Sequence, residues 1–256
     1  MPLRIAFDLD GVLADMESEL VRQAEAVFGE AMTRRLQEGG IANANGAAAL
    51  PERKADPDSG SRIAAEKIAD TTPPLLKLKM TSRQQRKLWH HVETIENFWE
   101  TLEELEPGVI RQVAGLASDR RWEIIFLTKR PESAGATAQV QTQRWLESKG
   151  FKLPSVFVVQ GSRGRIAAAL GLDIVIDDRP ENCLDVVVDS KARAILVWRE
   201  DESLLPVAAR RLGIGVVKSV GECLDILEQI DAPERDQPGV MDRVMRLLGL
   251  KEPASA

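Results

Sequence analysis

The sequence predicts an α/β protein with a doubly wound parallel sheet and a mainly helical segment inserted near its start. From Trp122 to residue 230, short β-branched runs alternate with amphipathic stretches, which is typical of βαβ units. A similar apolar run at residues 3–7 supplies one further strand. Residues 15–105 instead show helical periodicity without a convincing strand. We therefore expect one Rossmann-like core that carries a helical insert.

The core is predicted to comprise residues 1–14 and 106–230. Its strands are short apolar runs, at residues 3–7, 123–127, 155–159, 174–176, 194–198 and 215–217. Amphipathic stretches between the later strands predict helices at residues 137–148, 165–170, 182–189, 204–212 and 220–230. In such a sheet, ligands bind beyond the carboxyl ends of the strands, so residues that follow the strands are the candidates for chemistry.

The insert, residues 15–105, is predicted to form a helical cap with helices at 16–37 and 82–95. Its middle, 39–60, is rich in Ala, Asn, Gly, Pro and charge and cannot bury much apolar surface, so we expect a mobile loop there. Pro73 and Pro74 mark a second break before the next helix. Residues 231–256 are predicted to be a polar linker followed by a short C-terminal helix.

The overall composition excludes several classes of protein. The chain has 256 residues, enough for one sizeable core and an accessory domain, and a formal net charge of -6 that argues against a nucleic-acid polymer as partner. No apolar run is long enough to span a bilayer, so we expect a cytoplasmic protein with no membrane partner. Cys183 and Cys223 lack metal-site spacing, and we interpret them as reduced and buried.

Two carboxylates and a glycine, Asp8, Asp10 and Gly11, follow the first predicted strand directly. Clustered carboxylates repel one another and are costly to desolvate, so they persist together most readily when a cation such as Mg²⁺ neutralises them. Gly11 would let the backbone turn sharply beside a ligand. A plain Asp/Gly turn explains this segment equally well when it is taken alone.

Basic and hydroxyl groups follow other strands. Thr128, with Lys129 beside it, ends the strand at 123–127, where a hydroxyl can donate to a phosphoryl oxygen. Arg163 opens the stretch before the next strand and would offset the charge of a phosphate, although Arg165 competes for this role. Each segment also fits an interpretation without a functional role: a proline turn in the first case and an exposed basic pair in the second.

Asp177 and Asp178 end another apolar strand. Adjacent carboxylates at a strand end repel each other and destabilise the fold unless they share a cation. An acidic cap for the following helix would explain one of these aspartates but less readily both. This pair is therefore the stronger indication of a metal site.

Together and in this order, the segments at residues 8–12, Thr128, Arg163 and Asp177-Asp178 resemble the four motifs of the haloacid dehalogenase (HAD)-like hydrolase superfamily. Residues 8–15, 97–108 and 176–182 further resemble its 5'(3')-deoxyribonucleotidase-like branch. The sequence departs from that branch in the long 39–60 insert and in the tail beyond residue 230. It also has arginine at position 163, where the superfamily more often has lysine.

The resemblance implies a phosphatase that transfers a phosphoryl group to Asp8 and then to water, with Asp10 as acid and base. It implies phosphate binding by Thr128, Lys129 and Arg163. The substrate would be a small phosphorylated metabolite, with a nucleoside monophosphate as one option, and the cap would close over the site. The cofactor implied is Mg²⁺, and its implied ligands are Asp8, Asp10 through its carbonyl, Asp177 and Asp178.

Three alternatives stay open at this point. A phosphomutase or another HAD phosphotransferase would share the same core. A phospho-acceptor module similar to a receiver domain would carry its acidic pair before the acceptor, whereas here the isolated pair comes last. A non-catalytic binding protein could keep the fold. A dehalogenase is disfavoured, because that chemistry does not need the cation site at Asp177 and Asp178.

The insert and its end also carry aromatic and histidine side chains that are candidates for contacting a substrate or for packing, and packing is favoured. They are Trp89, His90, His91, Phe98 and Trp99.

Overall fold

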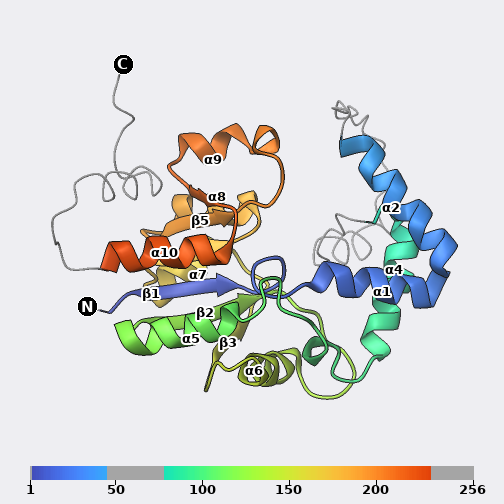
Figure 1. Ribbon diagram of the computed structural model, residues 1–256, viewed down its shortest axis with the longest axis horizontal. Helices are drawn as coiled ribbons and strands as arrows, with labels where there is room; N and C mark the ends of the chain where they lie inside the picture. Colours follow the sequence, from blue (N-terminus) through green and yellow to red (C-terminus); the bar gives the residue numbers. More distant parts are fainter. Residues whose placement is uncertain (1, 45–77, 232–256) are drawn as a thin grey trace, which may run out of the picture. The chain divides into compact units, whose positions relative to one another are not determined.

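The computed structural model describes residues 2–44 and 78–231, which divide into two compact units (Figure 1). The first unit contains the described residues of the stretches 1–15, 99–128 and 139–256, and it is an α/β unit. The second contains those of the stretches 16–98 and 129–138, and it is mainly helical.

The α/β unit contains a parallel six-stranded sheet with the order β3-β2-β1-β4-β5-β6. The strands are β1 (Arg4–Asp8), β2 (Glu123–Thr128), β3 (Ser155–Val158), β4 (Ile174–Asp177), β5 (Arg193–Val197) and β6 (Gly215–Val217). All of the predicted strands are present, and the doubly wound fold class is confirmed. The chain runs from β1 toward β3 on one side and from β4 toward β6 on the other, so the order reverses between β1 and β4.

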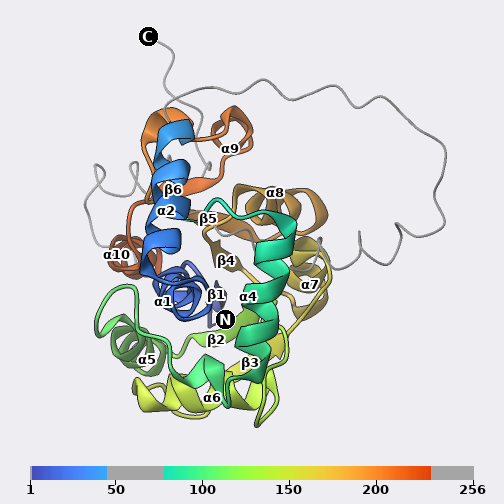
Figure 2. The ribbon, with the colours of Figure 1, turned by 90° about the vertical axis from the view of Figure 1, so that its right-hand side faces the viewer.

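The helices of this unit cover both faces of the sheet. They are α5 (Val109–Arg120), α6 (Ala138–Ser148), α7 (Arg163–Leu170), α8 (Pro180–Asp189), α9 (Val207–Arg211) and α10 (Val220–Asp231). Seen end-on in Figure 2, α5 and α10 lie on one side of the sheet and α7 and α8 lie on the other. The short 3-10 turns η1 (Phe98–Glu100) and η2 (Glu202–Leu204) complete the elements.

Helix α5 is an element that the sequence analysis missed. Its buried residues Val109, Ile110 and Val113 have the i, i+1, i+4 spacing of a helix face, which is the signal that could have found it. The single helix predicted at 204–212 is instead η2 followed by α9, because Pro206 lies between them and lacks the amide that a continuous helix requires.

The core between the sheet and the α7–α8 face is made of small and branched apolar side chains. Ala6, Leu127 and Val175 from the central strands pack there with Ala167 of α7 and Val186 of α8. Cys183 belongs to the same layer, and both Cys183 and Cys223 are buried and unpaired, as predicted. Burial raises the pKa of the Cys183 thiol well above its ordinary value, so this thiol stays protonated.

The helical unit contains α1 (Met16–Phe28), α2 (Glu30–Ala44) and α4 (Ser82–Thr94), and α1 contacts both of the others. The continuous helix predicted at 16–37 is wrong, because Gly29 breaks it with a φ of 81°, which favours glycine. Helix α4 begins with a capping box in which Thr81 and Gln84 each bind the other's backbone amide.

The expected start of the loop at Gly39 is also wrong, since α2 continues through Ala44. Two alanines in its last four residues favour that continuation. Residues 45–60 of the predicted loop, the break at Pro73-Pro74 and the predicted C-terminal helix lie outside the described residues. Within the described ranges, no helix combines the length and apolar character that crossing a membrane requires.

Candidate active site

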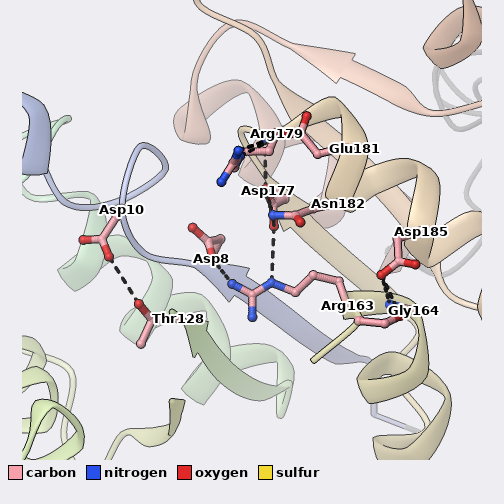
Figure 3. A network of polar contacts seen from close by, with 11 residues as sticks. Asp8, Asp10, Thr128, Arg163, Gly164, Asp177, Arg179, Glu181, Asn182 and Asp185 are labelled. Carbon is pink, nitrogen blue, oxygen red and sulfur yellow. Dashed lines mark hydrogen bonds and ion pairs between the residues drawn. The ribbon is translucent and has the colours of Figure 1, made fainter. Parts of the chain in front are cut away.

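The predicted motif residues of the α/β unit lie where parallel strands end (Figure 3). Asp8 is the last residue of β1, Thr128 of β2 and Asp177 of β4, and these three strands are neighbours in the sheet. Arg163 is the first residue of α7, the helix that leads into β4. The topology therefore collects side chains from four distant segments at the point where the strand order reverses, which is where open α/β sheets bind ligands.

Arg163 joins two of the carboxylates. Its Nη2 donates to Asp8 Oδ1 at 2.5 Å, and its Nε lies 3.7 Å from Asp177 Oδ2. All three side chains are buried, with Arg163 only 2% exposed. Arg165, two residues later on α7, is exposed. Helix α7 therefore places Arg163, not Arg165, in the site.

Asp177 is held by the start of α8 as well as by Arg163. The side-chain amide of Asn182 donates to both of its carboxylate oxygens at 3.0 Å, and the Arg179 backbone amide donates to Oδ1 at 2.9 Å. Asn182 was part of a predicted motif region, but no role was predicted for it. Its position five residues after Asp177, on the first turn of α8, is the signal that could have found it.

Asp178 is arranged differently from its neighbour. Its Oδ1 is buried and has no hydrogen-bond partner among the described residues. The carboxylate lies against Gly11, where a Cβ atom would overlap it, and Gly11 has a φ of 91°. Glycine is therefore required at position 11 both by the backbone conformation and by the close approach of Asp178.

The acids have unusual proton affinities because they are buried together. Burial, and then the charge of Asp177, raise the pKa of Asp8 well above its ordinary value, although Arg163 opposes this. Burial also raises the pKa of Asp177, against Arg163 and the Asn182 hydrogen bonds. For Asp178, burial and the charge of Asp177 raise the pKa to about 8. One guanidinium does not compensate these carboxylates, so a proton or a bound cation must do so.

Asp10 lies in the turn after β1 and takes a separate partner. Thr128 Oγ1 donates to Asp10 Oδ2 at 3.2 Å. The Asp10 side chain is outside the carboxylate cluster of Asp8, Asp177 and Asp178. Lys129 belongs to the helical unit, so its predicted phosphate contact stays a prediction.

The segment before Arg163 is anchored to α8. Ser162 caps α7 by accepting from the Arg165 amide, and its hydroxyl donates to Asp185 at 2.6 Å. Asp185 also accepts from the Gly164 amide at 3.1 Å, and a Cβ at Gly164 would overlap the Asp185 carbonyl oxygen. This support was not predicted from the sequence; it holds the first turn of α7 and therefore the direction of Arg163.

The predicted aromatic and histidine candidates are accounted for mainly by packing. Trp99 is fully buried, and its amide donates to Gln141 at 3.0 Å. In the helical unit, His91 Nε2 lies 3.1 Å from Gln23 Oε1, whereas His90 is exposed.

The acidic cluster fits a hard divalent cation. Asp8, Asp177 and Asp178 each offer a carboxylate oxygen, and these oxygens lie within 4.8 Å of one another. Carboxylate oxygens are the ligands that Mg²⁺ prefers, and Asp178 Oδ1, which no described residue binds, is available for such a bond. The predicted contribution of the Asp10 carbonyl stays a prediction.

Comparison of the sequence with models of protein families and with curated proteins finds no match. The structure, however, is similar to solved ones. A HAD-family hydrolase from Deinococcus radiodurans R1, solved with bound phosphate and sodium, is 16% identical with a TM-score of 0.52, over 89% of this chain and 96% of that one. A dehalogenase solved with an intermediate complex is 14% identical with a TM-score of 0.50, over 91% of this chain and 98% of that one.

These similarities show that the chain has the HAD fold, as the motif resemblance implied. The resemblance to the 5'(3')-deoxyribonucleotidase-like branch stays a prediction. Because the same fold is found in a dehalogenase, the function has to be argued from the site.

Proposed function

We propose that this protein is a Mg²⁺-dependent phosphatase that hydrolyses a small phosphomonoester through an aspartyl-phosphate on Asp8. The observation that carries the proposal is the buried cluster of Asp8, Asp177 and Asp178, with Arg163 bonded to the Asp8 carboxylate. An enzyme that brings an anionic nucleophile to an anionic phosphate must supply positive charge at that point. The cluster offers a cation site there in addition to the guanidinium.

Asp8, Asp177 and Asp178 would hold the cation. Bound Mg²⁺ supplies charge neutralisation, which keeps Asp8 ionised despite its burial and reduces its repulsion from the phosphate. Asn182 and the Arg179 amide keep Asp177 oriented, and hydrogen bonds of this kind to a ligating carboxylate tune metal affinity. Arg163 Nη1, which is buried and has no hydrogen-bond partner among the described residues, is available to donate to a phosphoryl oxygen.

In the first step, an Asp8 oxygen attacks phosphorus and the bond to the ester oxygen breaks. Asp10 donates its proton to the leaving oxygen, so the alcohol departs neutral and Asp10 becomes a carboxylate. Thr128 holds the Asp10 carboxylate through its hydroxyl.

In the second step, water attacks phosphorus of the acyl-phosphate and Asp10 takes a proton from that water. The bond to Asp8 breaks, inorganic phosphate leaves and both aspartates return to their starting states.

We infer that the substrate is a small phosphorylated metabolite, and a nucleoside monophosphate is the first class to test because of the resemblance to nucleotidases. A HAD-fold hydrolase solved with bound phosphate and sodium supports phosphate as the ligand. A dehalogenase shares the fold, but its chemistry would leave the cation site without a purpose.

The test measures phosphate release from a panel of nucleoside monophosphates, sugar phosphates and p-nitrophenyl phosphate, with Mg²⁺ or with EDTA. Asp8→Asn should lower turnover at least about a thousandfold, because it removes the nucleophile. Asp173→Asn is the matched control. This exposed carboxylate lies just before β4, at the opposite end of that strand from Asp177.

Wild-type protein stopped in acid during turnover should carry labelled phosphate that hydroxylamine releases. Turnover that is equal in wild type and Asp8→Asn, or that EDTA leaves unchanged, would contradict the proposal. Retention of the phosphate on a sugar with a change of position would instead indicate a phosphomutase.

A further inference from the structure

Arg199 follows β5 at the same edge of the sheet as the acids, and the motifs give it no role. Its guanidinium donates from Nη1 to the Gly11 carbonyl at 2.6 Å and from Nη2 to the Val12 carbonyl at 3.3 Å. Its target is therefore the backbone of the turn after β1, which carries Asp10 and faces Asp178 through Gly11.

The turn already has internal hydrogen bonds. The Leu9 carbonyl accepts from the amides of Val12, Leu13 and Ala14, at 3.3, 2.8 and 2.8 Å. These bonds define the shape of the turn. Arg199 instead ties it to β5, the strand two positions away from β1 in the sheet.

Glu106 orients Arg199. Its Oε1 accepts from Arg199 Nη2 at 2.7 Å, and its two carboxylate oxygens also accept from the amides of Val220 and Gly221 at 2.8 and 3.0 Å. Glu106 is thus bound to the first turn of α10. The Leu105 amide beside it donates to the Leu13 carbonyl at 2.9 Å, so this segment is attached to the same turn.

A surface ion pair on its own stabilises a protein by about 0 to 1 kcal/mol. The Arg199–Glu106 pair differs because Arg199 also donates to two carbonyls of one turn, while Glu106 caps a helix of the core. A planar, forked guanidinium can make these bonds at once, whereas a lysine ammonium cannot reproduce the geometry. The guanidinium therefore fixes the turn relative to β5 and α10.

We propose that Arg199, oriented by Glu106, is a positioning residue that holds the turn after β1 so that Asp10 delivers its proton to the leaving oxygen. This inference rests on the proposed phosphatase function. It predicts a defect that depends on the leaving group, because a poor leaving group requires the proton and a good one departs without it.

The test compares kcat/KM for p-nitrophenyl phosphate, which has a good leaving group, with kcat/KM for phenyl phosphate, which has a poorer one. Arg199→Ala should lower kcat/KM about tenfold more for phenyl phosphate than for p-nitrophenyl phosphate, a part of the range expected of general acid catalysis. Arg199→Lys and Glu106→Gln should shift the ratio in the same direction by less. Arg193→Ala, at the other end of β5, is the matched control and should leave the ratio unchanged.

A purely structural role would lower both rates together. Asp10→Asn should change the ratio more than Arg199→Ala does, and Arg199→Ala added to Asp10→Asn should change it no further. Thermal unfolding checks each variant, and if Arg199→Ala does not fold, Arg199→Lys and Glu106→Gln decide the question. An unchanged ratio in these variants with an active wild type would overturn the inference alone. Absence of all hydrolysis by wild type would instead overturn the proposed function, and the inference with it.

Discussion

The end of β4 and the turn after β1 contribute to the same site by different means. At the end of β4, Asp177 is held in a buried, charged environment by Arg163 and the first turn of α8, and the Asp178 carboxylate lies beside it against Gly11. In the turn after β1, backbone amides converge on the Leu9 carbonyl, and Arg199 binds two further carbonyls. The first region is organised by charge and the second by backbone geometry.

This difference predicts how each region responds to pH, to a cation and to substitution. Buried carboxylates with raised pKa values respond to pH, to a cation and to the removal of a charge. A turn held by backbone hydrogen bonds is disturbed by substitutions that alter its backbone shape, and its stability depends little on pH. Gly11 is where the two regions meet, because the turn places it against the Asp178 carboxylate.

Of the changes that distinguish the two regions, Asp178→Asn in the charged region should have the largest effect. We expect hydrolysis to fall about a hundredfold or more with weaker Mg²⁺ dependence, because a carboxylate of the proposed cation site is lost. Asp177→Asn should in addition lower the free energy of unfolding, since this carboxylate accepts three hydrogen bonds. Equal Mg²⁺ titrations for wild type and Asp178→Asn would contradict the assignment.

A smaller effect distinguishes the two regions by the pH dependence of the free energy of unfolding. The folded-state pKa of Asp178 is about 8 against an ordinary value of 3.8, so the folded protein keeps a proton that the unfolded chain loses. Without Mg²⁺, the free energy of unfolding of wild type should therefore fall relative to Asp178→Asn as pH rises from about 4 to 8, by on the order of a few kcal/mol.

Denaturant unfolding at several pH values checks this expectation. Mg²⁺ should restore the stability of wild type most strongly at the high-pH end, because it binds the ionised carboxylates of the folded state. A difference between the two proteins that does not change with pH in the absence of Mg²⁺ would show that folding does not raise the pKa of Asp178.

The smallest effect tests the shape of the turn by comparing Gly11→Ala with Gly108→Ala. Both glycines have positive φ, 91° and 84°, so each change should lower the free energy of unfolding by about 1 kcal/mol or more. Apart from its chain neighbours, no described residue comes within 4 Å of a Cβ at Gly108, whereas a Cβ at Gly11 would overlap Asp178.

Gly11→Ala should therefore cost about 1 to 2 kcal/mol more than Gly108→Ala and should also lower hydrolysis. Denaturant unfolding and a steady-state assay measure the two effects. Equal losses of stability with full activity in both variants would mean that the turn moves away from Asp178 without consequence.

Much of the fold could be predicted because the signals are local. Each strand was placed to within about one residue, since apolar, β-branched runs bounded by turns are read directly from the chain. The errors in the predicted helices also concern single segments of the chain. The helix at 16–37 was predicted through Gly29, and α5 was missed although Val109, Ile110 and Val113 carry its pattern.

By itself, the sequence determined the order of the strands along the chain and the placement of Asp8, Thr128 and Asp177 at strand ends, because the apolar pattern of a strand is a property of neighbouring residues. Only the tertiary structure decided whether Arg163 or Arg165 contacts the acids, left Asp178 Oδ1 without a hydrogen-bond partner in the part of the chain that the structure describes, and joined Arg199 to the turn after β1. Arg199 and Gly11 are 188 residues apart, and their contact depends on strand order and the rotation of side chains. No local pattern in the chain encodes that proximity.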